Sequence, residues 1–376
     1  MKVLVAGDFC PMDRVSKLIE DRQYEAIFDQ VECVVKQSDY SIVNFECPVR
    51  KTIGEGIKKA GPTLKCSEKA IDAIRHAGFN CATLANNHFY DQGEDGVKET
   101  IHALDMAGLD HVGGGFNFKD AALTLYKTIK GKTLAIINCC EHEFSIATDT
   151  KGGSNPLNIV QQYYAIQEAR QKAEYVLVIV HGGIEHFQFP SPRMVETYRF
   201  FIDAGADAVI NHHQHCFSGF ESYRGKPIFY GLGNFCFDWQ KRRTKLWDEG
   251  FMVMLDFADN YIGYQLYPYF QNNETPGVHL MDDASFNDWK QRFDSISEVI
   301  CDSKILLSKY NELLARTERN YSANLTPYTN RFALALYKRH FLPMLLSKRK
   351  LRTLLNMLMC ESHYDRMINM LRNYSK

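Results

Sequence analysis

Short apolar runs alternate with amphipathic segments along roughly the first 260 residues of the chain. Each run has the length of a buried strand, and each amphipathic segment repeats its apolar positions with the period of a helix. The pattern predicts strands at 3–6, 40–45, 81–85, 134–138, 176–180, 208–210, 227–231 and 251–257. It predicts helices at 24–37, 67–76, 93–106, 159–173 and 193–204. Strands that alternate with helices indicate an α/β architecture.

The pattern changes after about residue 260. Residues 271–277 are polar and loop-like, which predicts a boundary between an α/β domain at 1–270 and a helical, basic extension at 271–376. Periodic apolar positions predict one long amphipathic helix at 286–319. Residues 331–376 interleave apolar side chains with Lys and Arg. Such a segment can lie on an anionic membrane surface, or it can pack on the rest of the protein as helices with a solvated basic face.

Composition and charge narrow the class of protein. Hydrophobic residues make up 45% of the chain and charged residues 24%, as in ordinary soluble globular proteins. The net charge of −1 gives no overall field that would attract nucleic acid, so we expect no nucleic-acid partner. The apolar run at 3–6 is too short for a signal peptide or a transmembrane segment, and no later run is long enough to span a bilayer. The eleven cysteines lack C-x-x-C spacing, which favours free thiols and a cytoplasmic location.

A cluster of polar residues follows the apolar run at 81–85. Asn86, Asn87 and His88 come first, and Asp91 and Gly93 complete the stretch. Polar groups at the end of a buried strand need partners, and amides, an imidazole and a carboxylate are side chains that a metal or catalytic site uses. The stretch alone fits a second interpretation equally well, which is an Asn-rich cap for the helix that follows.

Similar side chains follow the carboxyl ends of other predicted strands. Together with His88, they are Asp8, Glu46, His181, His213 and His215. One of them alone, such as His181, could be a core histidine. In open α/β sheets, however, ligands bind at this edge, and the coincidence repeats at five strand ends. We therefore expect these side chains to form one site.

The residue types at this site indicate metal binding. Carboxylates combined with imidazoles suit a divalent Mn, Fe or Zn ion. The spacing of His213 and His215 would place both imidazoles on one side of an extended strand. Six candidate ligands are more than one tetrahedral ion needs, so we expect two ions. Two ions about 3.5–4 Å apart can polarise a phosphoryl group and activate water.

Six motifs occur in a fixed order along the chain. They are Gly7-Asp8, Asn44-Phe45-Glu46-Cys47-Pro48, Ala85-Asn86-Asn87-His88 with Asp91 and Gly93, His181-Gly182-Gly183 with Glu185, His212-His213-Gln214-His215, and Tyr230-Gly231-Leu232-Gly233-Asn234-Phe235. In this order, over about residues 1–260, the chain resembles the capsule synthesis protein CapA family. That family is named for poly-γ-glutamate capsule biosynthesis and is similar to the calcineurin-like metallophosphoesterases. The resemblance implies a four-layer α/β/β/α sandwich with a site for two divalent ions.

The resemblance also implies a role for each matching residue. The implied ligands are Asp8 and His215 for the first metal, Asn87, His181 and His213 for the second metal, and Glu46 at the bridging position. His88 matches the imidazole that assists the leaving group, with Asp91 as the residue that orients it. Residues implied to support the ligands or to bind substrate are Asn44, Asn86, Glu185, His212 and Asn234.

Cys10 and Glu46 are among the positions that depart from the phosphoesterase pattern. Cys10 stands where the Asp-x-His motif has its histidine. Its thiolate could bind a soft metal, although a buried structural cysteine is the more common role of such a residue. Glu46 stands in place of an aspartate, which changes the expected spacing of the metals.

Two functions of different class remain open from the sequence. The first is a metal-dependent hydrolase of phosphoesterase type that acts in capsule or extracellular polymer biosynthesis. The second is a non-catalytic protein that uses the metal fold to assemble a capsule synthesis complex or to hold its polymer. The partners implied are an anionic polymer, glycan or phosphorylated intermediate, a capsule synthase complex, and peripheral contact with the inner membrane through residues 331–376.

Overall fold

The computed structural model describes residues 1–51, 55–259 and 261–374. The chain forms two compact units, Met1–Leu307 and Ser308–Lys376. Lys376, the last residue of the basic segment predicted from the sequence, lies outside the described residues.

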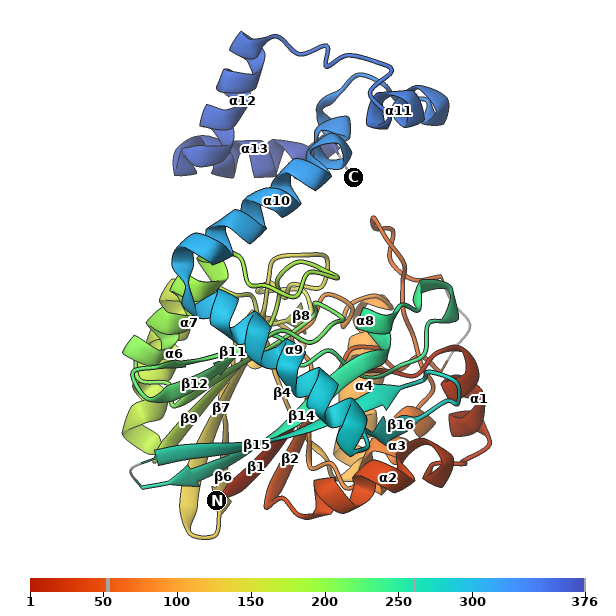
Figure 1. Cartoon of the computed structure of the whole chain (residues 1–376), viewed down its shortest axis with the longest axis vertical. Helices are drawn as coiled ribbons and strands as arrows, with labels where there is room; N and C mark the ends of the chain where they lie inside the picture. Colours follow the sequence, from red (N-terminus) through yellow and green to blue (C-terminus); the bar gives the residue numbers. More distant parts are fainter. Residues whose placement is uncertain (52–54, 260, 375–376) are drawn as a thin grey trace. The chain divides into compact units, whose positions relative to one another are not determined.

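The first unit contains two large β-sheets (Figure 1). The eight-stranded sheet has the order β16-β15-β14-β1-β2-β3-β4, with β13 also paired to β1. Its strands are β1 (Lys2–Cys10), β2 (Tyr40–Phe45), β3 (Cys81–Thr83), β4 (Asp110–Val112), β13 (Asn234–Phe237), β14 (Glu249–Ala258), β15 (Tyr261–Gln271) and β16 (Val278–Leu280). The six-stranded sheet has the order β11-β12-β10-β9-β7-β6. Its strands are β6 (Leu125–Ile129), β7 (Lys132–Cys140), β9 (Tyr175–His181), β10 (Ala208–His212), β11 (Phe220–Tyr223) and β12 (Lys226–Phe229).

Helices cover these sheets. The longer ones are α1 (Asp13–Glu20), α2 (Glu25–Lys36), α3 (Lys69–His76), α4 (Gly93–Ala107), α6 (Ile159–Lys172), α7 (Pro192–Asp203) and α9 (Asp283–Cys301). Short elements connect them, namely β5 (Gly114–Gly115), α5 (Phe118–Ala121), β8 (Gly153–Ser154), η1 (Gln240–Arg242) and α8 (Lys245–Asp248). Residues 55–65 lie outside helices and strands, and residues 52–54 lie outside the described residues.

The alternation of side chains along β1 shows how the layers are built. Val3 and Val5 belong to a core that includes the strands of the six-stranded sheet, whereas Leu4 and Ala6 belong to a core that includes helices α1 to α4. Helices α6 and α7 contribute Ile166 and Phe201 to the first of these cores. Since neighbouring side chains on a strand point to opposite faces, the order of layers is helices, sheet, sheet, helices. The four-layer α/β/β/α architecture expected from the sequence is confirmed.

The structure corrects the predicted helix at 286–319. Two helices occupy this region, α9 and α10 (Ser303–Ser322), and they are separated at Asp302. The Asp302 backbone is extended, and its carboxylate accepts hydrogen bonds from the N–H groups of Lys304 and Ile305 at 2.9 and 3.1 Å. This is the geometry of a helix N-cap, so a new helix begins there.

The structure also moves the predicted domain boundary. The expected boundary at 270/271 precedes β16 and α9, and both belong to the first unit. Strand β16 pairs with β15 as part of the eight-stranded sheet. In α9, Trp289 and Phe293 are buried in the core and stack on each other with ring centroids 5.0 Å apart. The division falls instead at 307/308, within α10.

The second unit is helical. After α10 it contains η2 (Ala323–Leu325), α11 (Arg331–Lys338), α12 (Lys348–Met359) and α13 (Glu361–Tyr374). Tyr337 is its most buried side chain among large residues: its hydroxyl is 2.8 Å from Ser322 Oγ, and the Arg319 guanidinium lies over its ring at 4.6 Å. Within residues 1–51, 55–259 and 261–374, no helix combines the length and the apolarity that crossing a bilayer requires.

Candidate metal centre

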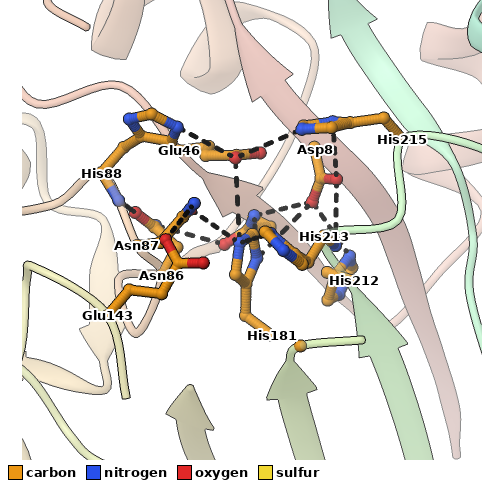
Figure 2. Close-up of polar contacts among 12 residues, drawn as sticks. Asp8, Glu46, Asn86, Asn87, His88, Glu143, His181, His212, His213 and His215 are labelled. Carbon is orange, nitrogen blue, oxygen red and sulfur yellow. Dashed lines mark hydrogen bonds and ion pairs between the residues drawn. The ribbon is translucent and has the colours of Figure 1, made fainter. Parts of the chain in front are cut away.

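The polar residues predicted from strand ends meet at one edge of the two sheets (Figure 2). Asp8 lies near the end of β1, Glu46 directly follows β2, and His181 is the last residue of β9. Asn86, Asn87 and His88 follow β3, and the histidines at 212, 213 and 215 lie at or after the end of β10. Strands β1 and β2 are parallel, and so are β9 and β10. Their carboxyl ends therefore meet at this edge, and all of these side chains are buried.

Five of these side chains form two overlapping sets of potential metal-ligand atoms, called the ligand sets below. Glu46, His181 and His213 make one set, and Asp8, Glu46 and His215 make the other. Within each set, one ligand atom from each residue lies within 4.8 Å of the others. Glu46 belongs to both sets, and its Oε1 lies 3.8 Å from His181 Nε2 and 4.0 Å from His215 Nε2. Glu46 is thus the carboxylate that the two sets have in common.

Both carboxylate oxygens of Glu46 lack a hydrogen-bond partner among the described residues. The Glu46 side chain is fully buried. Burial, and then the charge of Asp8, raise the pKa of Glu46 well above its usual range. An unpaired buried carboxylate is costly, and a cation held by both ligand sets would compensate its charge. The donors present therefore fit divalent metal ions of the Mn, Fe or Zn type.

The pKa shifts of the neighbouring side chains also favour a bound metal ion. Burial raises the pKa of Asp8 to about 7 and lowers the pKa of His181 and of His215 well below the usual value. Burial thus makes the ionised form of Asp8 unfavourable, and it favours the neutral form of His181 and His215. Neutral imidazoles are the form that binds metal. A metal at this edge would stabilise the ionised carboxylates and would bind the neutral imidazoles through a ring nitrogen.

The two histidines of the His-x-His motif reach the site by a route that differs from the prediction. Strand β10 ends at His212, and His213 and His215 have positive φ angles of 92° and 54°. The chain therefore turns at these positions instead of continuing as a strand, so side-chain alternation is not what brings the two imidazoles together. The His213 N–H donates to Asp8 Oδ2 at 3.2 Å, which anchors the turn beside the carboxylate. Backbone strain of this kind is typical of functional sites.

Asn234 and Asn44 orient ligand atoms from outside the two sets. Asn234 Oδ1 lies 2.9 Å from His215 Nδ1, and if it accepts that ring proton the Nε2 lone pair is free to face Glu46. Asn44 donates from Nδ2 to Asp8 Oδ1 at 2.7 Å. Gly7 allows the β13 segment to approach, because a Cβ at Gly7 would lie 1.9 Å from the carbonyl oxygen of Gly233. The sequence motif around Gly233 therefore serves close backbone approach.

Asn87 lies between one ligand set and a residue that the sequence did not reveal. Its Oδ1 is 3.1 Å from His181 Nε2, and its Nδ2 donates to Glu143 Oε2 at 3.1 Å. The amide therefore turns its nitrogen toward Glu143 and its oxygen toward His181. The neighbouring Asn86 shapes this turn, since its Oδ1 accepts the N–H of His88 at 3.1 Å.

His88 stands beside the ligand sets with two buried partners. Its Nδ1 is 2.6 Å from Asp91 Oδ2, and its Nε2 is 4.0 Å from Glu46 Oε1. Lys59, another residue that the sequence did not reveal, forms an ion pair with Asp91 Oδ1, and its Nζ is 3.2 Å from His88 Nδ1. The Lys59 side chain is only 2% exposed although it comes from an irregular loop. Burial lowers the pKa of His88, and the Asp91 carboxylate acts against this shift.

Three other residues lie at the margin. Glu185, expected to support the ligands or bind substrate, belongs to neither ligand set, and its side chain is 43% exposed. His212 Nδ1 is 3.5 Å from Asp8 Oδ1, and burial lowers the pKa of His212 to about 3. Cys10 is buried outside both ligand sets, and burial raises the pKa of its thiol to about 11. A thiol of that kind is a structural group.

The chain is similar to proteins of one bacterial family. The family described as bacterial capsule synthesis protein PGA_cap matches residues 2–239, a span that contains every residue of both ligand sets. Over 268 residues the chain is 34% identical to "Capsule biosynthesis protein CapA" of Bacillus anthracis, which covers 69% of this chain and 64% of that protein. Over 247 residues it is 32% identical to "PGA biosynthesis protein CapA" of Bacillus subtilis (strain 168), which covers 64% of both proteins.

Solved structures also match parts of the chain. The 5'-nucleotidase from Candida albicans aligns with a TM-score of 0.41 and 11% sequence identity, over 84% of this chain and 57% of that one. A hypothetical protein from Thermus thermophilus aligns with a TM-score of 0.45 and 16% identity, over 71% of this chain and 99% of that one.

The matched part of this chain corresponds to 64% of the length of each of the two CapA relatives, which is somewhat less than two thirds.

Proposed function

This chain belongs to the bacterial capsule synthesis protein family, and on that premise we propose that its first unit is a metal-dependent hydrolase of phosphoesterase type that acts in capsule or extracellular polymer biosynthesis. The observation that carries the proposal is the Glu46 carboxylate, which is buried, has no hydrogen-bond partner among the described residues, and is shared by two ligand sets. The names of the two CapA relatives support the biosynthetic role.

The cofactor in this proposal is a pair of divalent ions. Asp8 and His215 would hold one ion, and His181 and His213 would hold the other with help from Asn87 Oδ1. Bound there, such ions supply Lewis-acid polarisation of a phosphoryl oxygen and an activated water.

The residues of the chain that handle protons are His88 and Asp91. Asp91 accepts the Nδ1 proton of His88 and so fixes the orientation of the ring. This leaves His88 Nε2 on the side of Glu46, where the imidazolium form of His88 would donate its Nε2 proton to the leaving oxygen of a phosphoester and become neutral. Lys59 compensates the charge of Asp91 in this buried position. Substrates that fit are phosphorylated or glycan intermediates of an anionic polymer.

The alternative function is a non-catalytic protein that binds the polymer or organises a capsule synthase complex. Cys10 favours it, because this buried thiol stands where phosphoesterases place another imidazole. The Asp8 set therefore has a single imidazole. All eleven cysteines are free thiols, which supports the proposed cytoplasmic location for either function.

The two functions are separated by a hydrolysis assay. The purified full-length protein would be stripped of metal, reloaded with Mn, Fe or Zn, and assayed on phosphomonoesters and phosphodiesters. We expect metal-dependent turnover in the wild type and its loss in Asp8→Asn, with Asp13→Asn on the exposed side of α1 as the matched control. Metal binding without turnover on any phosphoester would favour the assembly function instead.

A further inference from the structure

The second unit exposes large apolar side chains along residues 331–371, a segment referred to below as the C-terminal surface. Phe332, Phe341 and Met359 are 66%, 72% and 71% exposed, and Leu355 and Leu358 are 55% and 58% exposed. Single exposed apolar residues are common on proteins, but several within one short segment mark an interaction site.

The same segment is strongly basic. Residues 331–371 contain eight Lys and Arg residues and two acidic residues, although the whole chain has a net charge of −1. The basic side chains are exposed. They include Lys338, Arg339, Lys348, Arg349, Lys350 and Arg352. The partner of this surface must therefore be both anionic and able to cover apolar side chains.

Helix α12 combines both properties within twelve residues. Leu351, Leu354, Leu355 and Leu358 follow the spacing i, i+3, i+4 and i+7, which places them on one stripe of the helix. No residue of α12 is buried, so nothing in the described chain fully covers this stripe.

The first turn of α12 carries a second sign of an anionic partner. Lys348, Arg349 and Lys350 occupy it, where the helix dipole favours negative charge. The Ser347 hydroxyl caps the helix by accepting the Lys350 N–H at 3.2 Å. Three cations beside a helix N-terminus repel it and one another, and bound anions would relieve both repulsions.

We propose that the C-terminal surface binds an anionic lipid bilayer, with α12 lying in the interface. Its leucine stripe would face the acyl chains, and its Lys and Arg side chains would reach the phosphate headgroups. A soluble polyanion would satisfy the charges but leave the leucines in water. A second copy of the chain would cover the leucines but bring like charges together across a symmetric contact. This proposal does not depend on catalysis in the first unit.

The test uses the full-length protein and sedimentation with lipid vesicles. Vesicles of phosphatidylcholine alone would be compared with vesicles that also contain phosphatidylglycerol. We expect binding only to the second kind, with weaker binding at high salt. Arg349→Glu with Lys350→Glu should lower the partition coefficient by about tenfold or more, and Leu355→Gln with Leu358→Gln should lower it comparably. Lys119→Glu with Leu123→Gln, an exposed pair in the first unit, is the matched control and should bind as the wild type does.

Three outcomes would overturn the proposal. The first is equal binding of wild type and both variants to phosphatidylglycerol vesicles. The second is self-association in analytical ultracentrifugation that the leucine variant abolishes, without vesicle binding. The third is binding of soluble poly-γ-glutamate that the charge variant abolishes and the leucine variant does not, again without vesicle binding. Unchanged circular dichroism of the variants would show that the second unit remains folded.

Discussion

The two units of this protein hold their candidate functional side chains in opposite environments. In the first unit, titratable residues converge at a sheet edge where Asp8 and Glu46 are fully buried. In the second unit, the C-terminal surface spreads its charged and apolar side chains over exposed helices. Each buried group in the first unit depends on a few fixed partners. Exposed groups in the second unit each contribute a small free energy to binding, and these contributions are roughly additive. Single substitutions should therefore have large effects in the first unit and small effects in the second.

His88→Ala should show the largest effect. The loss of a general acid typically lowers turnover by about 10²–10⁴-fold. Metal content should stay close to that of the wild type, because His88 belongs to neither ligand set. Kinetics on the best phosphoester, together with elemental analysis, would measure both quantities, and His102→Ala on the exposed face of α4 is the control. Loss of metal as complete as that in His213→Ala would show that His88 is a ligand.

Lys59→Met should have the next largest effect, on stability. It removes the cation beside Asp91, whose side chain is fully buried. Breaking a buried ion pair by deleting one partner costs about 3 kcal/mol or more. Urea unfolding of the metal-free protein would measure this loss, with the exposed neighbouring Lys58→Met as the matched control. Equal unfolding free energies for the two variants would mean that Lys59 does not stabilise Asp91.

Glu143→Ala should have a smaller effect, confined to metal affinity. It removes the acceptor that holds Asn87 Nδ2. Loss of a partner that orients a metal ligand typically weakens binding by about 10–100-fold. Glu143→Gln should retain most of the affinity, because its amide oxygen can still accept the hydrogen bond. Isothermal titration with Mn would compare the two variants, and equal losses in both would argue against an orienting role.

Leu355→Gln should have the smallest effect on folding. Its side chain is 55% exposed on α12, and exposed substitutions usually change stability by less than about 0.5 kcal/mol. Thermal unfolding without lipid would measure this, with Tyr337→Ala, at a buried position of the same unit, as the contrasting variant. A large destabilisation by Leu355→Gln would mean that the leucine stripe is packed in solution and that the two units differ less than described.

Local pattern was enough to predict which strand ends bring polar side chains together. Asp8, Glu46 and His181 directly follow or end apolar runs, and parallel strands bring such positions to one edge. Lys59 and Glu143 could not be predicted, because both come from loops whose approach to the site depends on tertiary packing. Periodicity also could not reveal the break at Asp302, since apolar spacing continues across it. Asp302 followed by Ser303 was the available signal, because both residues are frequent at helix N-caps.

The turn after β10 could not be predicted from the alternation of side chains along a strand. His213 and His215 do converge, but through left-handed backbone conformations that a strand pattern does not predict. Such conformations are rare for residues other than glycine, and here the His213 N–H is fixed by Asp8, which is distant in sequence. Sequence patterns could therefore identify which residues meet without showing the backbone path that brings them together.

The proposed function depends above all on Glu46 binding both metal ions, and the metal content of a set of variants tests this directly. Each purified full-length protein would be loaded with Mn, desalted and measured by elemental analysis. We expect about two ions per chain in the wild type, about one in His213→Ala, and close to none in Glu46→Gln. Glu32→Gln, at a partly buried position on α2, should behave as the wild type does. Full metal content in Glu46→Gln, or none in the wild type, would contradict the account.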